Sequence, residues 1–175
     1  MEKAFFFDRD GIVNRRLIGD YVKNIDEFQF LEDFFPIFSL ASERKYLKIL
    51  ITNQQCIGKK IITEDELNHI HDFMQTELVK RTGEKFDAIY VAPDLASSNS
   101  FRRKPAPGMI LEAIEKYKIS PEESWMLGDA VSDVVAGKAA KTKTILMGDY
   151  VDIPEADFIF PSLKEVFDFL KDNLK

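Results

Sequence analysis

The chain has a single cysteine, Cys56, among its 175 residues. One cysteine cannot form a disulfide within the chain, and it cannot supply the several thiolates of a cysteine-rich zinc site. No histidine lies near Cys56 in the sequence to act as its base, which favours a small packed residue over a reactive nucleophile. A disulfide framework and a cysteine-rich metal centre are therefore both excluded.

Positive charge and long apolar runs are also lacking. The chain has 24 Lys and Arg against 30 Asp and Glu, a net charge of −6. A long nucleic-acid groove needs a basic surface, so we expect no nucleic-acid partner, although a local basic pocket would suffice for a small anion. The start "MEKAFFFD" is too short an apolar run for a signal peptide, and no stretch approaches a membrane span. We expect a cytoplasmic protein without a membrane partner; its oligomeric state is not indicated.

Hydrophobic residues nevertheless make up 45% of the chain, and the length suits one domain over residues 1–175. Short apolar segments alternate with helical patterns, which predicts an α/β, Rossmann-like, doubly wound and mainly parallel sheet with helices on both faces. The intervals after the first two strands each hold about one helix, so we expect no cap domain. Strands are predicted at 4–7, 46–52, 86–92, 124–128, 143–148 and 157–160.

Polar side chains suited to chemistry follow these strands at their carboxyl ends. They are Asp8 and Asp10 after the first strand, Thr52 and Asn53 after the second, Arg103 and Lys104 before the helix that precedes the fourth, and Asp129 and Asp133 after the fourth. Parallel strands bring their carboxyl ends to one edge of a sheet, where ligands bind. We therefore expect all these side chains to meet in one crevice, with Gly11 allowing the sharp exit from the first strand.

Four aspartates in one crevice repel each other, so at least one takes up a proton unless a cation lies among them. Carboxylate oxygens favour a hard ion, and Mg²⁺ accepts a few carboxylates together with waters and a phosphate oxygen. Lys104 adds positive charge where a phosphoryl transition state spreads negative charge over its oxygens. The pattern predicts Mg²⁺ as cofactor and a small phosphate ester as ligand.

The order and spacing of these residues resemble the haloacid dehalogenase superfamily of phosphohydrolases, whose signature is D-x-D-G, a strand-end Thr or Ser, a Lys, and G-D-x-x-x-D. Four segments are similar to those of its heptose-bisphosphate and histidinol-phosphate phosphatases: "FFFDRDGIVN", "YVKNIDEFQF", "ITNQQCIGKK" and "FRRKPAPGMI". The resemblance implies a Mg²⁺-dependent phosphomonoesterase. Its expected substrate is a sugar phosphate such as a heptose 1,7-bisphosphate, with histidinol phosphate as the alternative.

The resemblance also implies a role for each residue. Asp8 attacks phosphorus and forms an aspartyl-phosphate, while Asp10 protonates the leaving alcohol and should be kept protonated by its environment until then. Thr52 and Lys104 hold the phosphoryl group. The implied metal residues are Asp8, Asp10 through its backbone carbonyl, Asp129, and Asp133, which orients the others and also caps a helix. The implied substrate-binding residues are Asn53, Arg103 and Tyr21.

Other interpretations compete with these roles. Asp8 and Asp10 are also common turn residues before a glycine. A non-catalytic phospholigand-binding protein on the same fold is an alternative from another class, although such a protein has no need of an acid–base group like Asp10. We expect Arg102 to be a solvated surface charge. His69 and His71, two residues apart on a helix, are expected on the surface.

Two segments depart from the resembled subfamily, many members of which carry a zinc loop. At the matching positions this chain has Ala92, Asp94, Ser100 and Arg102, so no zinc site of that type can form and other contacts must hold the loop. Its run "SSNS" at 97–100 predicts a flexible tip that is tied down only at "RRKPAP". The stretch between Asn14 and Tyr21 is slightly longer than usual, so we expect a different pocket rim.

Overall fold

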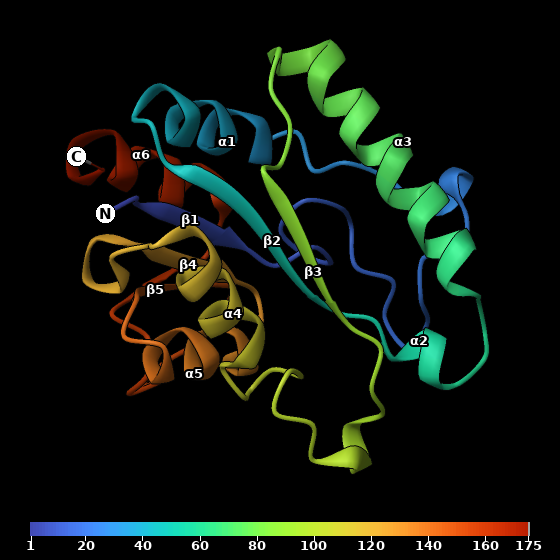
Figure 1. The fold of residues 1–175 in the computed structure, drawn as a ribbon. Helices are drawn as coiled ribbons and strands as arrows, with labels where there is room; N and C mark the ends of the chain where they lie inside the picture. The colour runs from blue at the N-terminus through green and yellow to red at the C-terminus, as the bar shows by residue number, and fades with distance from the viewer. Residues whose placement is uncertain (175) are drawn as a thin grey trace.

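The computed structural model describes residues 1–174, in which six parallel strands form one sheet in the order β3-β2-β1-β4-β5-β6 (Figure 1). Every neighbouring pair of strands is parallel. The strands are β1 (Ala4–Phe7), β2 (Leu47–Asn53), β3 (Ala88–Ala92), β4 (Trp125–Gly128), β5 (Lys143–Met147) and β6 (Phe158–Phe160). The strand order reverses at β1, so the doubly wound sheet predicted from the sequence is confirmed.

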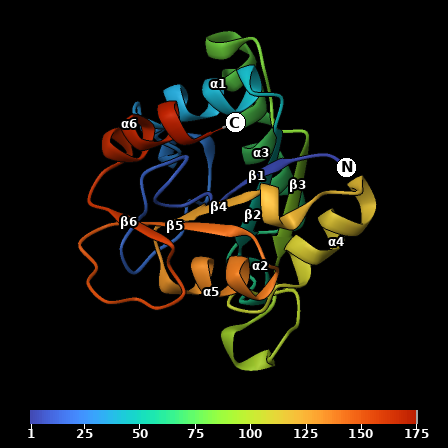
Figure 2. The same ribbon diagram turned by 90° about the vertical axis from the view of Figure 1, so that its left-hand side faces the viewer.

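Helices cover both faces of the sheet. Figure 2 shows α1 (Phe34–Glu43) and α6 (Leu163–Asn173) on one side, and α4 (Gly108–Tyr117) and α5 (Val131–Ala139) on the other. The interval after β1 holds a short 3₁₀ turn at Ile25–Glu27 and α1, and the interval after β2 holds the four-residue α2 (Gln55–Gly58) and α3 (Glu64–Thr82). No cap domain is inserted in either interval. The short α2 was not expected.

The three consecutive phenylalanines of β1 divide between the two cores. Side chains alternate along a strand, so Phe5 and Phe7 pack beneath α1 and α6, while Phe6 packs toward α4 and α5. All three are fully buried. β1 lies between β2 and β4, with Phe7 opposite Leu50 and Leu127. Asp8, the next residue, is therefore held at the carboxyl edge in the middle of the sheet.

Helix α3 begins with a capping box, and one of its side chains does not lie where the sequence predicted. Thr63 Oγ1 accepts from the Glu66 backbone N–H, and Glu66 Oε2 accepts from the Thr63 N–H. His69 is exposed as expected, but His71 is buried, so the prediction that both lie on the surface is wrong for His71. His71 lies four residues after Leu67 and three before Met74, which places it on the buried face.

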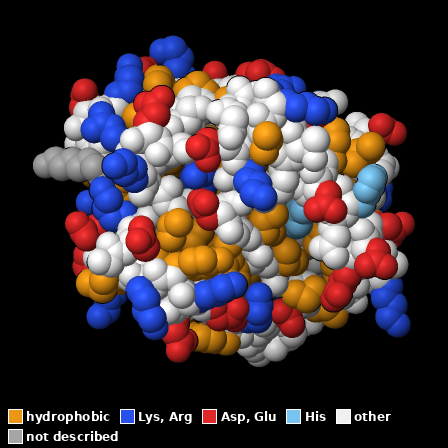
Figure 3. Space-filling view, turned by 45° about the horizontal axis from the view of Figure 1, so that its top comes forward, with side chains coloured by type: hydrophobic (Ala, Val, Ile, Leu, Met, Phe, Trp, Pro, Cys, Tyr) orange, Lys and Arg blue, Asp and Glu red, His pale blue; other side chains and the backbone are white. Residues whose placement is uncertain are grey.

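The surface carries charges of both signs in close mixture. On the face shown in Figure 3, lysine and arginine side chains alternate with aspartate and glutamate side chains, and hydrophobic side chains lie between them. Within residues 1–174, no helix combines the length and the apolar character that a membrane span requires.

We predict that Phe7→Ala lowers the free energy of unfolding by about 3–5 kcal/mol, because it removes a ring from a closely packed aromatic cluster. The Phe7 ring centroid lies 4.5 Å from that of Phe5, 5.5 Å from that of Phe34 and 5.8 Å from that of Phe86. Urea denaturation measures the change. Phe101→Ala is the matched control, since that ring is 64% exposed and should lose no more than about 0.5 kcal/mol. Equal losses in the two variants would contradict this description of the core.

Candidate active site

A small crevice opens at the carboxyl edge of the sheet, above β1. Its volume is about 70 Å³, and the residues that line it are Asp8, Asp10, Arg16, Asn53, Lys104, Ala130, Ser132 and Asp133. These residues come from the segment after β1, the end of β2, the segment before α4, and the start of α5. The structure therefore brings together polar side chains that the sequence placed at the ends of separate strands. Arg16 is a further member that sequence reasoning missed.

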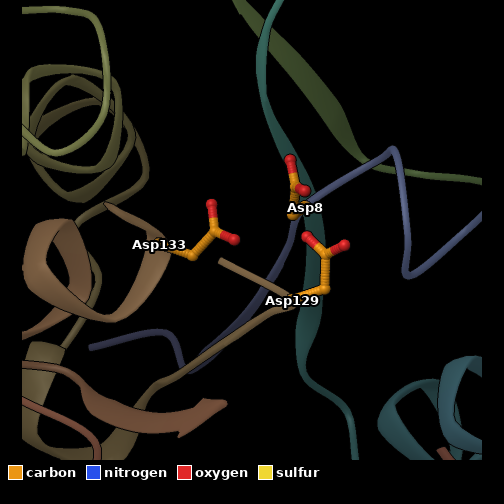
Figure 4. Close-up of side chains that lie close together, drawn as sticks. All are labelled: Asp8, Asp129 and Asp133. Atoms are coloured by element: carbon orange, nitrogen blue, oxygen red, sulfur yellow. The ribbon is translucent and has the colours of Figure 1, made fainter. Parts of the chain in front are cut away.

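Three carboxylates converge in this crevice (Figure 4). One oxygen each of Asp8, Asp129 and Asp133 lies within 4.8 Å of the others. The Lys104 ammonium lies between two of them, with Nζ 2.6 Å from Asp8 Oδ1 and 2.7 Å from Asp133 Oδ1, and it also donates to the Ile51 carbonyl. Burial on its own would lower the pKa of Lys104, but Asp133 and Asp8 outweigh burial and raise it. Lys104 therefore remains a cation.

Burial, together with neighbouring like charges, shifts the pKa of two of these carboxyls upward. Burial, assisted by the Asp133 carboxylate and opposed by Lys104, raises the pKa of Asp8 to about 6. Burial and the Asp8 carboxylate raise the pKa of Asp129 to about 8, although Arg16 opposes them. A cluster of this kind holds a proton near neutral pH unless a further cation enters it, as we expected.

These side chains fit Mg²⁺. The cluster offers only carboxylate oxygens, which a hard divalent ion prefers, and such an ion would relieve the like-charge repulsion that adds to burial in raising the pKa values of Asp8 and Asp129. Asp133 is the third residue of α5 and not its N-cap, which corrects the sequence expectation: its Oδ2 accepts from the Ala130 N–H at 3.0 Å. With Oδ1 paired to Lys104, both Asp133 oxygens have protein partners. This arrangement suits a residue that orients the cluster.

Two glycines make room for the aspartates. Gly11 has a φ of +98°, as its expected role in the exit from β1 requires, and a Cβ there would lie 1.9 Å from Asp129 Oδ2. A Cβ on Gly128 would lie 2.2 Å from the Cβ of Asp133. Neither contact is sterically possible. The glycines of D-x-D-G and G-D-x-x-x-D therefore allow the carboxylates to approach each other.

The Asp10 carboxylate faces donors instead of other acids. It accepts from Arg9 Nη2 at 3.0 Å, Asn14 Nδ2 at 3.0 Å and Gln54 Nε2 at 2.8 Å. Burial alone would raise the pKa of Asp10, but the Arg9 charge and these hydrogen bonds outweigh it and lower the pKa. The expectation that its surroundings keep Asp10 protonated is wrong. The predicted role of Asp10 as a proton donor would therefore require it to gain a proton when the charge of a bound substrate changes this environment.

Behind Asp10 lies a buried pair that sequence reasoning missed. Arg9 is fully buried, and its Nη1 lies 3.2 Å from Nε2 of His71. A guanidinium has no acceptor, so Nε2 of His71 must be unprotonated and accept this hydrogen bond. Burial and the Arg9 charge lower the pKa of His71 to about 3, which keeps the ring neutral. The helix periodicity around His71 was the signal available for this pair.

The other residues that the sequence analysis singled out lie around the crevice or in the core. Thr52 Oγ1 accepts from Gln54 Nε2, which also donates to Asp10. The Gln54 amide therefore links the residues at the ends of β1 and β2. Asn53 donates to the Lys104 carbonyl and accepts from its N–H, at 2.9 and 3.0 Å. Arg103 lines an adjoining cavity of about 500 Å³ together with Asn53 and Lys104. Cys56 is buried, as expected, and burial raises the pKa of its thiol.

Tyr21 is not brought to the crevice. Its hydroxyl accepts from Lys59 Nζ at 3.0 Å, and within residues 1–174 no hydrogen bond or ion pair joins its side chain to the carboxylate cluster. A substrate contact by Tyr21 stays a prediction.

Polar contacts hold the loop at the positions that match zinc ligands. Asp94 Oδ2 accepts from Ser100 Oγ at 3.0 Å, and Ser100 Oγ accepts from the Arg102 N–H at 3.3 Å. Arg102 is a surface charge as expected, with its side chain 43% exposed, but it is not only solvated: it donates to the Val91 carbonyl and forms an ion pair with Glu112. The expectation that the loop is tied down only at "RRKPAP" is also wrong, because Asp94 and Ser100 close it upon itself.

Comparisons with known proteins identify the family of this chain. The HAD-hydrolase-like family model matches residues 101–166. The chain is 34% identical to a D-glycero-beta-D-manno-heptose-1,7-bisphosphate 7-phosphatase from Pasteurella multocida (strain Pm70), over 98% of each chain, and 33% identical to one from Helicobacter pylori (strain J99), over 97% of each. The crystal structure of a D,D-heptose 1.7-bisphosphate phosphatase from B. bronchiseptica, complexed with magnesium and phosphate, superposes with a TM-score of 0.88 at 26% identity, covering 98% of this chain and 99% of that one.

Since such relatives align over nearly its whole length, the chain belongs to the haloacid dehalogenase-like hydrolases, in the family of the heptose-bisphosphate phosphatases. It is a phosphatase. The superfamily resemblance read from the strand-end motifs is therefore confirmed.

We predict that the metal-free protein loses stability as the pH rises from about 6.5 to 8. The pKa of Asp129 is raised to about 8 from its ordinary value of 3.8, so below about pH 8 the folded protein holds a proton that the unfolded chain has already lost; stability therefore falls as the pH rises toward 8 and levels off above it. The pKa values of Asp8, about 6, and of His71, about 3, lie below this window.

Thermal melting in a chelating buffer at pH 6.5, 7.5 and 8.5 measures this dependence. The melting temperature should fall across the series, and the fall should be much smaller in Asp129→Asn, which has no carboxyl to titrate. Saturating Mg²⁺ should raise the melting temperature most at the highest pH. If the melting temperature of Asp129→Asn fell with pH as steeply as that of the native protein, a group other than Asp129 would be the one that titrates.

Proposed function

We propose that this phosphatase is a Mg²⁺-dependent phosphomonoesterase that uses Asp8 as its nucleophile and a heptose 1,7-bisphosphate as its substrate. The observation that carries the mechanism is the position of Asp8: fixed at the tip of the central strand, it lies 2.6 Å from the Lys104 ammonium and faces Asp129 and Asp133. A carboxylate held rigidly beside a buried cation, at the open edge of the sheet, is arranged to attack an incoming phosphorus atom.

Asp8 and Asp129 would hold the ion, together with the backbone carbonyl of Asp10, and Asp133 would orient them. When bound, Mg²⁺ neutralises charge on the phosphoryl oxygens and lets a dianion approach the aspartates. Lys104 adds a second positive charge on the same side of the site. Its three N–H donors are used by Asp8, Asp133 and the Ile51 carbonyl, so its charge is already positioned, and a phosphoryl oxygen would contact it by taking over one of these hydrogen bonds.

In the first step, one Asp8 oxygen bonds to phosphorus and the ester bond to the alcohol breaks, with the proton for the alcohol supplied by Asp10. In the second step, Asp10 takes a proton from water, the water oxygen bonds to phosphorus, and the Asp8 carboxylate is released. The low pKa of free Asp10 suits the second step directly. The first requires Asp10 to gain a proton when the substrate's negative charge approaches.

The choice of substrate rests on the relatives and on the neighbouring cavity. The curated relatives act on heptose 1,7-bisphosphates, as their names state. Next to the crevice lies the cavity of about 500 Å³ lined by Asn53, Asn99 and Arg103, which has space for a sugar and a guanidinium for a second phosphate. A purely non-catalytic binder on this fold would have no use for the hydrogen-bonded Asp10.

We predict Mg²⁺-dependent phosphate release from a heptose 1,7-bisphosphate, with a higher kcat/KM than for histidinol phosphate or for p-nitrophenyl phosphate. Asp8→Asn is nearly isosteric but removes the nucleophile, so kcat should fall about a thousandfold or more. Asp72→Asn makes the same chemical change on the exposed face of α3 and should leave kcat unchanged. A comparable activity of Asp8→Asn and Asp72→Asn would rule out the nucleophile, and a preference for histidinol phosphate would rule out the substrate.

A further inference from the structure

Arg16 forms an ion pair with the carboxylate cluster that the proposed reaction does not use. Its Nη2 lies 2.8 Å from Asp129 Oδ1 and 3.8 Å from Asp8 Oδ2. The side chain is 45% exposed, so it can leave the cluster without breaking a packed core. Arg16 belongs to the stretch between Asn14 and Tyr21, whose unusual length predicted a different pocket rim. This segment therefore delivers a second cation to the site, in addition to Lys104.

The oxygens that Arg16 faces are those that an ion in this cluster would use. Lys104 contacts Asp8 Oδ1 and Asp133 Oδ1, and the Ala130 N–H is bound to Asp133 Oδ2. The oxygens left for an ion are Asp8 Oδ2 and those of Asp129, and Arg16 lies against Asp8 Oδ2 and Asp129 Oδ1. Mg²⁺ requires oxygens at about 2.1 Å in a near-ideal octahedron. A guanidinium at hydrogen-bond distance from the same carboxylate oxygens occupies that space and repels the ion.

We propose that Arg16 and Mg²⁺ bind the Asp8–Asp129 pair in exchange for each other, and that the released Arg16 side chain then contacts the bound phosphate. This inference rests on the proposed Mg²⁺-dependent function. Arg16 lines the same crevice as Asp8 and Lys104, so a short rotation of its flexible side chain keeps it within reach of a phosphoryl group there. A guanidinium offers five donors in a planar fork that matches phosphate oxygens. Arg16 is thus a counter-ion of the carboxylates in one state and a substrate-binding residue in the other.

The exchange is measurable without turnover. Calorimetry with Mg²⁺ alone should show that Arg16→Gln binds the ion roughly fivefold or more tightly than the native protein, because no guanidinium has to be displaced. A second titration uses inorganic phosphate at saturating Mg²⁺. Here Arg16→Gln should bind roughly fivefold or more weakly, because the released side chain is missing. Arg16→Lys keeps the positive charge but loses the planar fork of donors. Its affinities for Mg²⁺ and for phosphate should lie between those of the native protein and of Arg16→Gln.

Arg15→Gln is the matched control. It removes the same charge from the adjacent position, where the side chain is exposed and, among residues 1–174, has no ion pair with an acid. Both affinities should be those of the native protein. If Arg16→Gln leaves Mg²⁺ affinity unchanged or weakens it, exchange does not occur; if phosphate affinity is unchanged at saturating Mg²⁺, the phosphate contact does not form. Either result overturns the proposal, and neither bears on whether Asp8 is the nucleophile.

Discussion

The repulsion among three carboxylates, two of them buried and one partly buried, is the constraint on which this site depends. Asp8, Asp129 and Asp133 meet within 4.8 Å, and a folded chain can hold them there only with positive charge or protons to compensate. Lys104 supplies one charge from the segment before α4, and Arg16 supplies another from the segment after β1. Burial, together with the neighbouring carboxylates, still raises the pKa values of Asp8 and Asp129 although Lys104 and Arg16 oppose the rise. The excess of negative charge is what makes it attractive to a divalent ion.

The two aspartates of D-x-D-G are only two residues apart, yet their surroundings are opposite. Asp8 faces other carboxylates, and the pKa of its carboxyl is raised. Asp10 faces Arg9, Asn14 and Gln54, and the pKa of its carboxyl is lowered. Divergent environments of neighbouring carboxyls are the usual basis for giving them different chemical roles. Here the division depends on Arg9, whose buried guanidinium is fixed by His71 on α3, so a helix remote in sequence helps to set the character of Asp10.

The fold and the principal site residues could be predicted from the sequence because both depend on short local patterns of residues. Alternating apolar and helical segments predict a parallel sheet, and the carboxyl ends of parallel strands must share one edge, so Asp8, Thr52 and Asp129 could be placed together. The partners of Asp10 could not be predicted in this way. Arg9 and Gln54 reach their partners with long side chains across different elements, and rotamers are not encoded in spacing. His71 is a different case, since its position relative to Leu67 and Met74 did indicate burial.

The central claim is that Asp8 becomes phosphorylated, which requires two displacements at phosphorus instead of one. The stereochemical course of hydrolysis tests this directly, using a substrate phosphorothioate ester made chiral at phosphorus with sulfur and two oxygen isotopes, and water of the third isotope. Each in-line displacement inverts the configuration, so attack by Asp8 followed by attack of water predicts overall retention. Net inversion in the released thiophosphate would show that water attacks the substrate itself, and it would contradict the role of Asp8 as nucleophile.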